Sequence, residues 1–185
     1  MKDNTVKVSF FGEKTARSLA YAALCLALCM VLPFLTGQIP QIGSMLSPMH
    51  IPVFLAGFLC GPWWAAAVGA VAPLLRHVLF GMPPFPTAFG MCAELLTYGL
   101  VCGLLYRGVG KRKGGIYLSL ISAMLAGRIV WGVTMKCILA AQGGAFTWAA
   151  FLAGAFTKAV PGIILHIVLI PVLVMVLERA DIIKK

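Results

Sequence analysis

Charged residues are scarce in this sequence, and acidic ones are the scarcest. Of its 185 residues only 11% are charged, with 5 Asp plus Glu against 15 Lys plus Arg. Soluble domains carry about 25% charged residues, whereas 61% of this chain is hydrophobic. One soluble core cannot bury that much apolar surface, so the composition excludes an ordinary soluble domain and predicts an all-α membrane protein.

Motifs for nucleotide hydrolysis and for peptide or ester hydrolysis are missing as well. The sequence contains no GxxxxGK[ST], no HExxH and no GxSxG. The 6 cysteines form no CxxC pair and lie mostly in apolar runs, which favours packing side chains over a disulfide frame or a metal site. We therefore expect no catalytic residues, no metal and no cofactor.

Hydropathy predicts six membrane-spanning helices in a single domain over residues 1–185. The second and third spans separate at Gly61-Pro62, because glycine ends helices and proline suits their first turn. Without that separation the chain has five spans. The approximate spans are 18–35, 50–60, 62–79, 87–106, 116–141 and 148–177.

Charge placement favours six spans over five. With six, all the basic clusters share one side with both termini, and the loops on the other side carry no Lys, Arg, Asp or Glu. The positive-inside rule then predicts cytoplasmic termini in a bacterial-type cytoplasmic membrane. The net charge of +10 thus indicates membrane topology and no nucleic-acid partner.

Ionisable residues inside the spans are the candidate ligand contacts, because a charge at mid-bilayer costs a few kcal/mol or more unless it faces a protein interior. Snorkelling to the interface is the alternative for the outermost ones, Arg76, His77 and Lys136. An internal ion pair is the alternative for Glu94, and simple packing for the two aromatic residues. The candidates are Arg76, Glu94, Tyr98, Arg128, Trp131, Lys136 and Lys158. Four cations against one acid favour an anionic or strongly polar ligand.

Small residues form a stripe on one face of the first span, and such stripes let another helix approach closely. Contact with a partner subunit and packing inside the bundle are both open. The members of this alanine stripe are Ala16, Ala20, Ala23 and Ala27. A second stripe predicts close packing of the third span on the short second one, through Ala65, Gly69 and Pro73.

Several short motifs occur in an order that resembles the substrate-binding S components of energy-coupling factor (ECF) vitamin transporters. They are HIPV, GxxxGP, PLL, GMPP, ELxxYGxxxGLLY and, near the end, PGIILHIVLIPVLV. The resemblance covers about residues 17–178 and is greatest to the pantothenate-type branch.

The resemblance implies an S-component bundle of six helices with an outer pocket. Helices four to six would build the pocket, and loops 36–49, 80–86 and 142–148 would roof it. The alanine stripe would contact an energy-coupling transmembrane subunit, and two separate ATPase subunits would supply energy. The ligand would be a small vitamin, with pantothenate or a similar carboxylate first, and a pyridoxine-like compound, folate or a queuosine precursor as alternatives.

Two other classes of function stay open from the residues alone. One is a small membrane-embedded enzyme that uses Glu94, His77 or His166 for acid–base chemistry, although no nucleophile or metal set supports it. The other is a channel or self-contained carrier, which would move its substrate without partner subunits.

Overall fold

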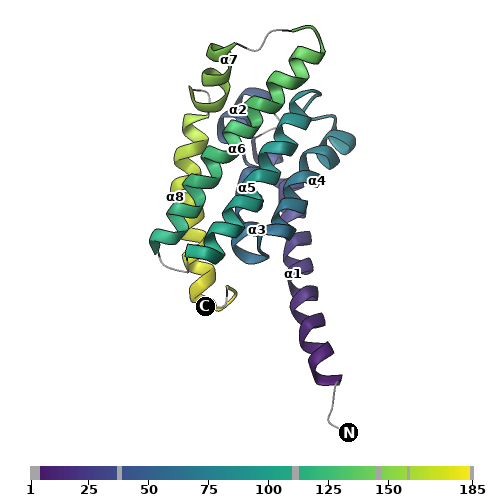
Figure 1. Ribbon diagram of the computed structural model, residues 1–185, viewed down its shortest axis with the longest axis vertical. Coiled ribbons are helices and arrows are strands. Elements are labelled where there is room, and N and C mark those ends of the chain that lie inside the picture. The colour runs from purple at the N-terminus through teal and green to yellow at the C-terminus, as the bar shows by residue number, and fades with distance from the viewer. Residues whose placement is uncertain (1–4, 37–38, 110–112, 145–146, 158, 184–185) are drawn as a thin grey trace.

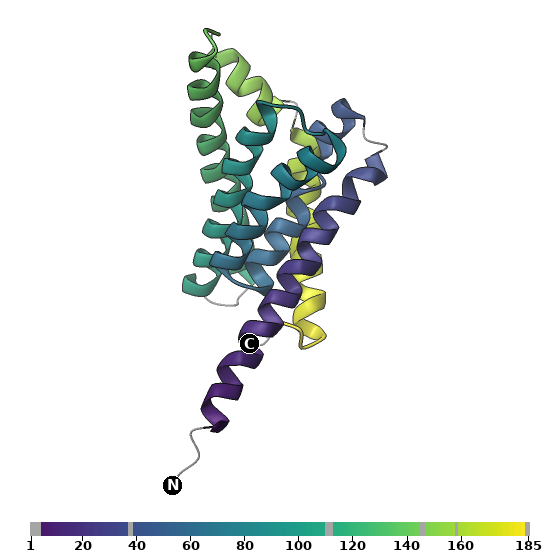
Figure 2. The same cartoon turned by 90° about the vertical axis from the view of Figure 1, so that its right-hand side faces the viewer.

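The computed structural model describes residues 5–36, 39–109, 113–144, 147–157 and 159–183, and the secondary structure in these ranges is helical. The long helices lie side by side in a bundle (Figure 1). The start of α1 and the end of α8 lie at the same end of the bundle, and α1 extends beyond it there (Figure 2). We call this the terminal end. The elements are α1 (Thr5–Val31), a 3₁₀ turn η1 (Leu32–Thr36), α2 (Pro40–Leu46), α3 (His50–Leu59), α4 (Pro62–Phe80), α5 (Thr87–Val109), α6 (Lys113–Ala141), α7 (Trp148–Leu152), a π-helical turn η2 (Ala153–Thr157) and α8 (Val160–Arg179).

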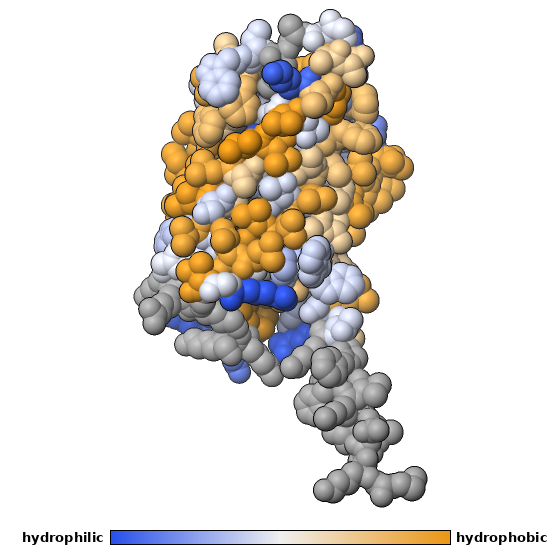
Figure 3. Space-filling view, in the orientation of Figure 1, coloured by the Kyte–Doolittle hydropathy of each residue, from blue (hydrophilic) through white to orange (hydrophobic). Residues whose placement is uncertain are grey.

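Apolar helices of membrane length dominate the described residues, which agrees with the predicted all-α membrane protein. Apolar side chains cover most of the middle of the face shown in Figure 3, and hydrophilic ones lie toward its ends. The second predicted span, 50–60, corresponds to α3, which has 10 residues and measures only about 15 Å along its axis, half of a ~30 Å hydrocarbon core. The helical segments of membrane length are Thr15–Thr36, Pro62–Phe80, Thr87–Val109, Gly114–Ala141 and Trp148–Arg179.

The chain reverses direction between α3 and α4, where the sequence predicts one helix to end and the next to begin. Gly61 has φ 88°, a left-handed conformation that glycine adopts without a steric penalty. Pro62 then occupies the first turn of α4, where its missing N–H leaves no intrahelical bond unmade.

The stretch predicted as one span over 148–177 contains three helical elements in the structure. α7 and the π-helical turn η2 precede α8, which begins at Val160 with Pro161 in its first turn. Proline cannot continue a preceding helix without losing a hydrogen bond, so the break before Pro161 follows from its backbone chemistry. This break brings Gly154 of η2 next to α6, where an added Cβ would be 2.6 Å from the Trp131 ring.

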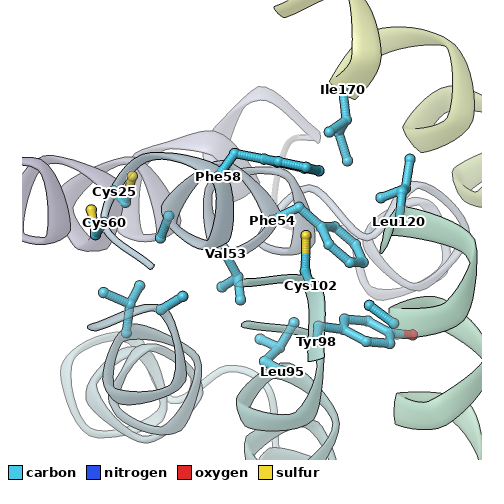
Figure 4. Close-up of a cluster of buried hydrophobic side chains, with 14 of the residues drawn as sticks. Cys25, Val53, Phe54, Phe58, Cys60, Leu95, Tyr98, Cys102, Leu120 and Ile170 are labelled. Carbon is cyan, nitrogen blue, oxygen red and sulfur yellow. The ribbon is translucent and has the colours of Figure 1, made fainter. Parts of the chain in front are cut away.

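The core surrounds α3, which is buried among its longer neighbours (Figure 4). Phe54 of α3 stacks on Tyr98 of α5 with ring centroids 4.8 Å apart. Leu120 of α6 and Ile170 of α8 are fully buried in the same cluster. Four of the free cysteines, including Cys102, are buried, which agrees with the prediction that cysteines here are packing side chains.

Glycines let α4 and α5 approach until their backbones touch. A Cβ on Gly69 would lie 2.3 Å from the Leu95 carbonyl oxygen, and one on Gly99 would lie 2.5 Å from the Ala65 carbonyl group. The prediction that the Ala65–Gly69–Pro73 stripe packs on the short preceding helix is therefore wrong for Ala65 and Gly69. Their neighbour is α5, because α5 supplies glycines of its own where the helices cross.

Replacing Gly99 by alanine should destabilise the protein by about 1–3 kcal/mol, because the added methyl group meets the backbone of α4 and not a movable side chain. Thermal unfolding in detergent measures the effect. Gly108→Ala is the matched control in the same helix, since nothing lies within 4 Å of its added Cβ. Equal melting temperatures for the two variants would contradict the close approach of α4 and α5.

Candidate functional site

A cavity of about 460 Å³ lies at the end of the bundle opposite to the terminal end. Its volume is in the range of about 300–1,000 Å³ that is typical of small-molecule sites. The segment between α1 and α3 and the connection between α4 and α5 enclose it, and α5, α6 and η2 complete its wall. Its lining is Pro33, Thr36, Ile39, Gln41, Gly43, Ser47, Pro48, Met49, His50, Arg76, Met82, Pro83, Pro84, Thr87, Met91, Glu94, Arg128, Trp131 and Gly154.

This cavity agrees in part with the pocket that the resemblance implies. The first two expected roof loops, 36–49 and 80–86, both contribute lining residues. Helices four to six of the prediction correspond to α5, α6 and the α7–η2–α8 stretch, and each contributes as well. The described residues of the third loop, 142–148, do not line the cavity.

Glu94 is the centre of a polar cluster at the floor of the cavity. Tyr98, one turn further along α5, donates a hydrogen bond from its hydroxyl to Glu94 Oε1 at 2.5 Å. Arg128 Nε of α6 lies 3.6 Å from the same oxygen, and His50 Nε2 of α3 lies 3.8 Å from Oε2. Glu94 therefore forms an internal ion pair with Arg128, as one of the two interpretations of the sequence predicts. Its carboxylate also lines the cavity.

Several buried polar atoms around this floor have no hydrogen-bond partner. They include His50 Nδ1 and Arg128 Nε. The His166 ring of α8 stacks on the His50 ring, with centroids 5.7 Å apart and planes at 15°. Buried polar groups without a partner are uncommon in native proteins, so their concentration beside a cavity marks the floor as a place where a ligand or ordered water completes the bonding.

Arg76 is buried in the cavity wall with only 3% of its surface exposed, so the alternative in which it snorkels to lipid is wrong. Its Nη1 donates a hydrogen bond of 2.6 Å to the carbonyl oxygen of Met30, in the last turn of α1. Carbonyl groups there lack intrahelical donors, and a guanidinium also suits the negative end of the helix dipole. The rings of Phe34 and Phe80 each lie 5.1 Å from the guanidinium carbon, as in cation–π contacts.

His77 anchors the second roof segment, where the sequence favours snorkelling. Its Nδ1 lies 2.8 Å from the carbonyl oxygen of Pro83, and this nitrogen is the donor because a carbonyl oxygen can only accept. Loop 80–86 is thus bonded to the bundle by His77. Arg76 contacts the end of α1 instead, because adjacent residues on a helix point in different directions.

The other predicted site residues divide into three cases. Trp131 lines the cavity. Tyr98 is buried behind Glu94 and does not line the cavity, so it positions the carboxylate and forms no ligand wall. Lys136 is exposed and outside the cavity lining, since it lies about two turns beyond Arg128 on a helix that continues past the roof. Lys158 lies outside the described residues.

Some lining residues were missed by the sequence interpretation although a signal existed. Thr87, Met91 and Glu94 all face the cavity and follow the spacing of one helix face. His50 is not among the predicted site residues, but the start of α3 brings it beside Glu94. No sequence signal places the roof residues, because their positions depend on how the loops fold over the bundle.

The alanine stripe lies on the outside of the bundle. Its four members are exposed in the structure, whereas Ala22, Cys25 and Cys29 on the opposite face of α1 are buried. In the isolated chain the alanine stripe therefore does not pack inside the bundle.

A membrane-spanning helical bundle with a roofed cavity and a polar floor defines a membrane protein that binds a small molecule. The chain belongs to the family of ECF transporter substrate-specific components, whose family model matches residues 17–174. None of the curated proteins and none of the solved structures compared with the chain matches it significantly. Members of this family are multi-pass membrane subunits of transporters and not enzymes, and they associate with energy-coupling and ATPase subunits.

Replacing Arg76 by methionine should lower stability by about 1.5–3 kcal/mol, because the charge-assisted hydrogen bond from Arg76 to the partly buried Met30 carbonyl is lost. Thermal unfolding of the detergent-solubilised protein measures this loss. Arg179→Met, at the exposed end of α8, removes the same charge without a buried contact and should leave the melting temperature unchanged. A melting temperature of Arg76→Met equal to that of the control would contradict the anchoring role.

Proposed function

We propose that the chain is the substrate-capture subunit of an ECF-type ABC importer. It binds a small water-soluble vitamin or vitamin precursor at the outer face of the membrane. Separate coupling and ATPase subunits then drive its release inside. The observation that carries this proposal is the roofed cavity of about 460 Å³ at one end of the bundle of a substrate-specific component.

The orientation in the membrane completes this proposal. The chain crosses a bacterial-type cytoplasmic membrane six times, with α3 as the short second span and both termini in the cytoplasm. Supporting this, Arg107 and Arg179 lie in the last turns of α5 and α8, at the terminal end. Segments 36–49, 80–86 and 142–147 at the cavity end carry no Lys, Arg, Asp or Glu. Lys and Arg are enriched in cytoplasmic loops, so the cavity faces outward.

The ligand that the sequence favours is pantothenate or a similar carboxylate. Two cations, Arg76 and Arg128, line the cavity and support it. Glu94 also lines the cavity, however, so the described lining carries one net positive charge, 2 − 1, with histidine neutral. That surplus is smaller than the four cations against one acid counted in the sequence. A pyridoxine-like compound, folate or a queuosine precursor therefore becomes an equal alternative.

Mass spectrometry of the small molecules released on denaturation tests the capture function directly. The purified chain should retain a vitamin-like compound in its cavity and show no ATPase activity. Thermal shift with a vitamin panel is the second measurement, since a ligand that binds only the folded state raises its stability. Recovery of no ligand, together with no stabilisation by any vitamin, would overturn the proposal.

The exposed alanine stripe should serve assembly and not ligand binding. Replacing Ala20 or Ala23 by tryptophan should leave the ligand affinity of the isolated chain within about two-fold, because both residues face away from the bundle. The same variants should lose most of their co-purification with the coupling subunit and their uptake activity.

Leu125→Trp is the control for this test, since it places the same ring on an exposed position of α6. It should assemble normally. Normal assembly of the Ala20 and Ala23 variants, or a large loss of their ligand affinity, would show that the stripe does not contact the partner.

A further inference from the structure

The ion pair between Arg128 and Glu94 at the cavity floor is too long for a hydrogen bond. Arg128 Nε and Glu94 Oε1 are 3.6 Å apart, beyond the about 2.7–2.9 Å of a charge-assisted hydrogen bond. Arg128 Nε has no hydrogen-bond partner, and neither has Nδ1 of His50. All three residues line the cavity and are at least nine-tenths buried, with exposures of 7% for Arg128, 4% for Glu94 and 3% for His50.

Packing around Tyr98 holds the Glu94 side of this pair in place. The Tyr98 hydroxyl bonds Glu94, and its ring is stacked on Phe54 (Figure 4). Gly127 lies under the same ring, where an added Cβ would be 2.2 Å from it. The donor and the acceptor of the floor therefore belong to separate rigid helices, α6 and α5, and a ligand meets them in a preformed arrangement.

The chemistry of the floor selects the polar group that fits. A carboxylate such as that of Glu94 only accepts hydrogen bonds, and the guanidinium of Arg128 only donates them. A ligand carboxylate would bond to Arg128 but place a second negative charge beside Glu94. A ligand amine would have the opposite conflict with Arg128. A neutral group that donates and accepts from the same edge satisfies both.

We propose that the ligand presents to Glu94 and Arg128 a neutral polar group that both donates and accepts hydrogen bonds along one edge. The class comprises a primary carboxamide, a lactam and an amino-substituted nitrogen ring such as an aminopyrimidinone. The N–H of the ligand donates to Glu94, and the adjacent oxygen or ring nitrogen accepts from Arg128. Trp131 lies one turn after Arg128 and lines the same cavity, so a flat ring can pack against it. This assignment rests on the proposed capture function and favours a nitrogen ring over a plain carboxylate.

Glu94→Gln tests the assignment, because its effect has opposite signs for the two ligand classes. The probes are pterin and aminomethyl deazaguanine, which carry an aminopyrimidinone edge, and pantothenate, which carries a carboxylate. Isothermal titration of the purified chain measures affinity. The edge-bearing probe that binds should bind the variant at least ten-fold more weakly, since a charged acceptor becomes a neutral one. A carboxylate bound at Arg128 would instead bind more tightly, since the like charge is gone.

Glu178→Gln is the matched control, because it makes the same substitution near the terminal end, where Glu178 accepts a hydrogen bond from Tyr106. It should leave affinity unchanged. Tyr98→Phe is the second variant, used also if Glu94→Gln does not fold. This variant removes the hydroxyl that donates to Glu94, so the Glu94 carboxylate becomes a stronger acceptor. A probe with the aminopyrimidinone edge should bind this variant at least as tightly as the wild-type chain, and a carboxylate should bind it more weakly.

The outcomes separate this inference from the capture function. Binding of pantothenate in preference to both ring probes, with tighter binding to Glu94→Gln, would overturn the inference and leave the capture function standing. Binding of a ring probe that Glu94→Gln does not weaken would overturn it as well. If no vitamin or probe binds or stabilises the wild-type chain, the capture function fails and the inference fails with it.

Discussion

The carboxylate of Glu94 is the constraint on which the rest of the site depends. A charge inside a membrane-spanning bundle is costly unless protein groups neutralise it, and no bulk water is available there to do so. Arg128, His50 and Tyr98 approach it from three helices, so satisfying one residue fixes how α3, α5 and α6 are placed around the cavity. The pair with Arg128 compensates the charge but, at 3.6 Å, it is too long for a hydrogen bond. The hydrogen-bonding capacity left at this floor supports the proposal that a polar molecule binds there.

The roof of the cavity is tied to the bundle by neighbouring residues at the cavity end of α4. Arg76 bonds the last turn of α1, where the first roof segment begins, and His77 bonds Pro83 in the second. One rigid helix end therefore positions both segments that cover the floor. Arg76 and His77 can stand in an otherwise apolar stretch because their polar groups bond backbone carbonyl oxygens.

Close helix packing supplies the rigidity that such a site requires. Where Gly69 and Gly99 bring α4 and α5 into backbone contact, neither helix can rotate or slide without a clash. The roof is built differently, from the short α2 and from turns. The exposed alanine face of α1 is separate from both.

The sequence by itself determined the fold class and much of the floor. Hydropathy and length suffice for membrane helices, because a bilayer requires only apolarity over a given distance, and ionisable residues in such helices have to face the interior, which identified Glu94 and Arg128. Only the tertiary structure decided that Arg76 bonds a backbone carbonyl, that His50 joins the floor and that Lys136 lies outside the cavity. These outcomes depend on the rotation and depth of each helix. Contacts between helices set this rotation and this depth. The pattern of residues along one helix carries no information on those contacts.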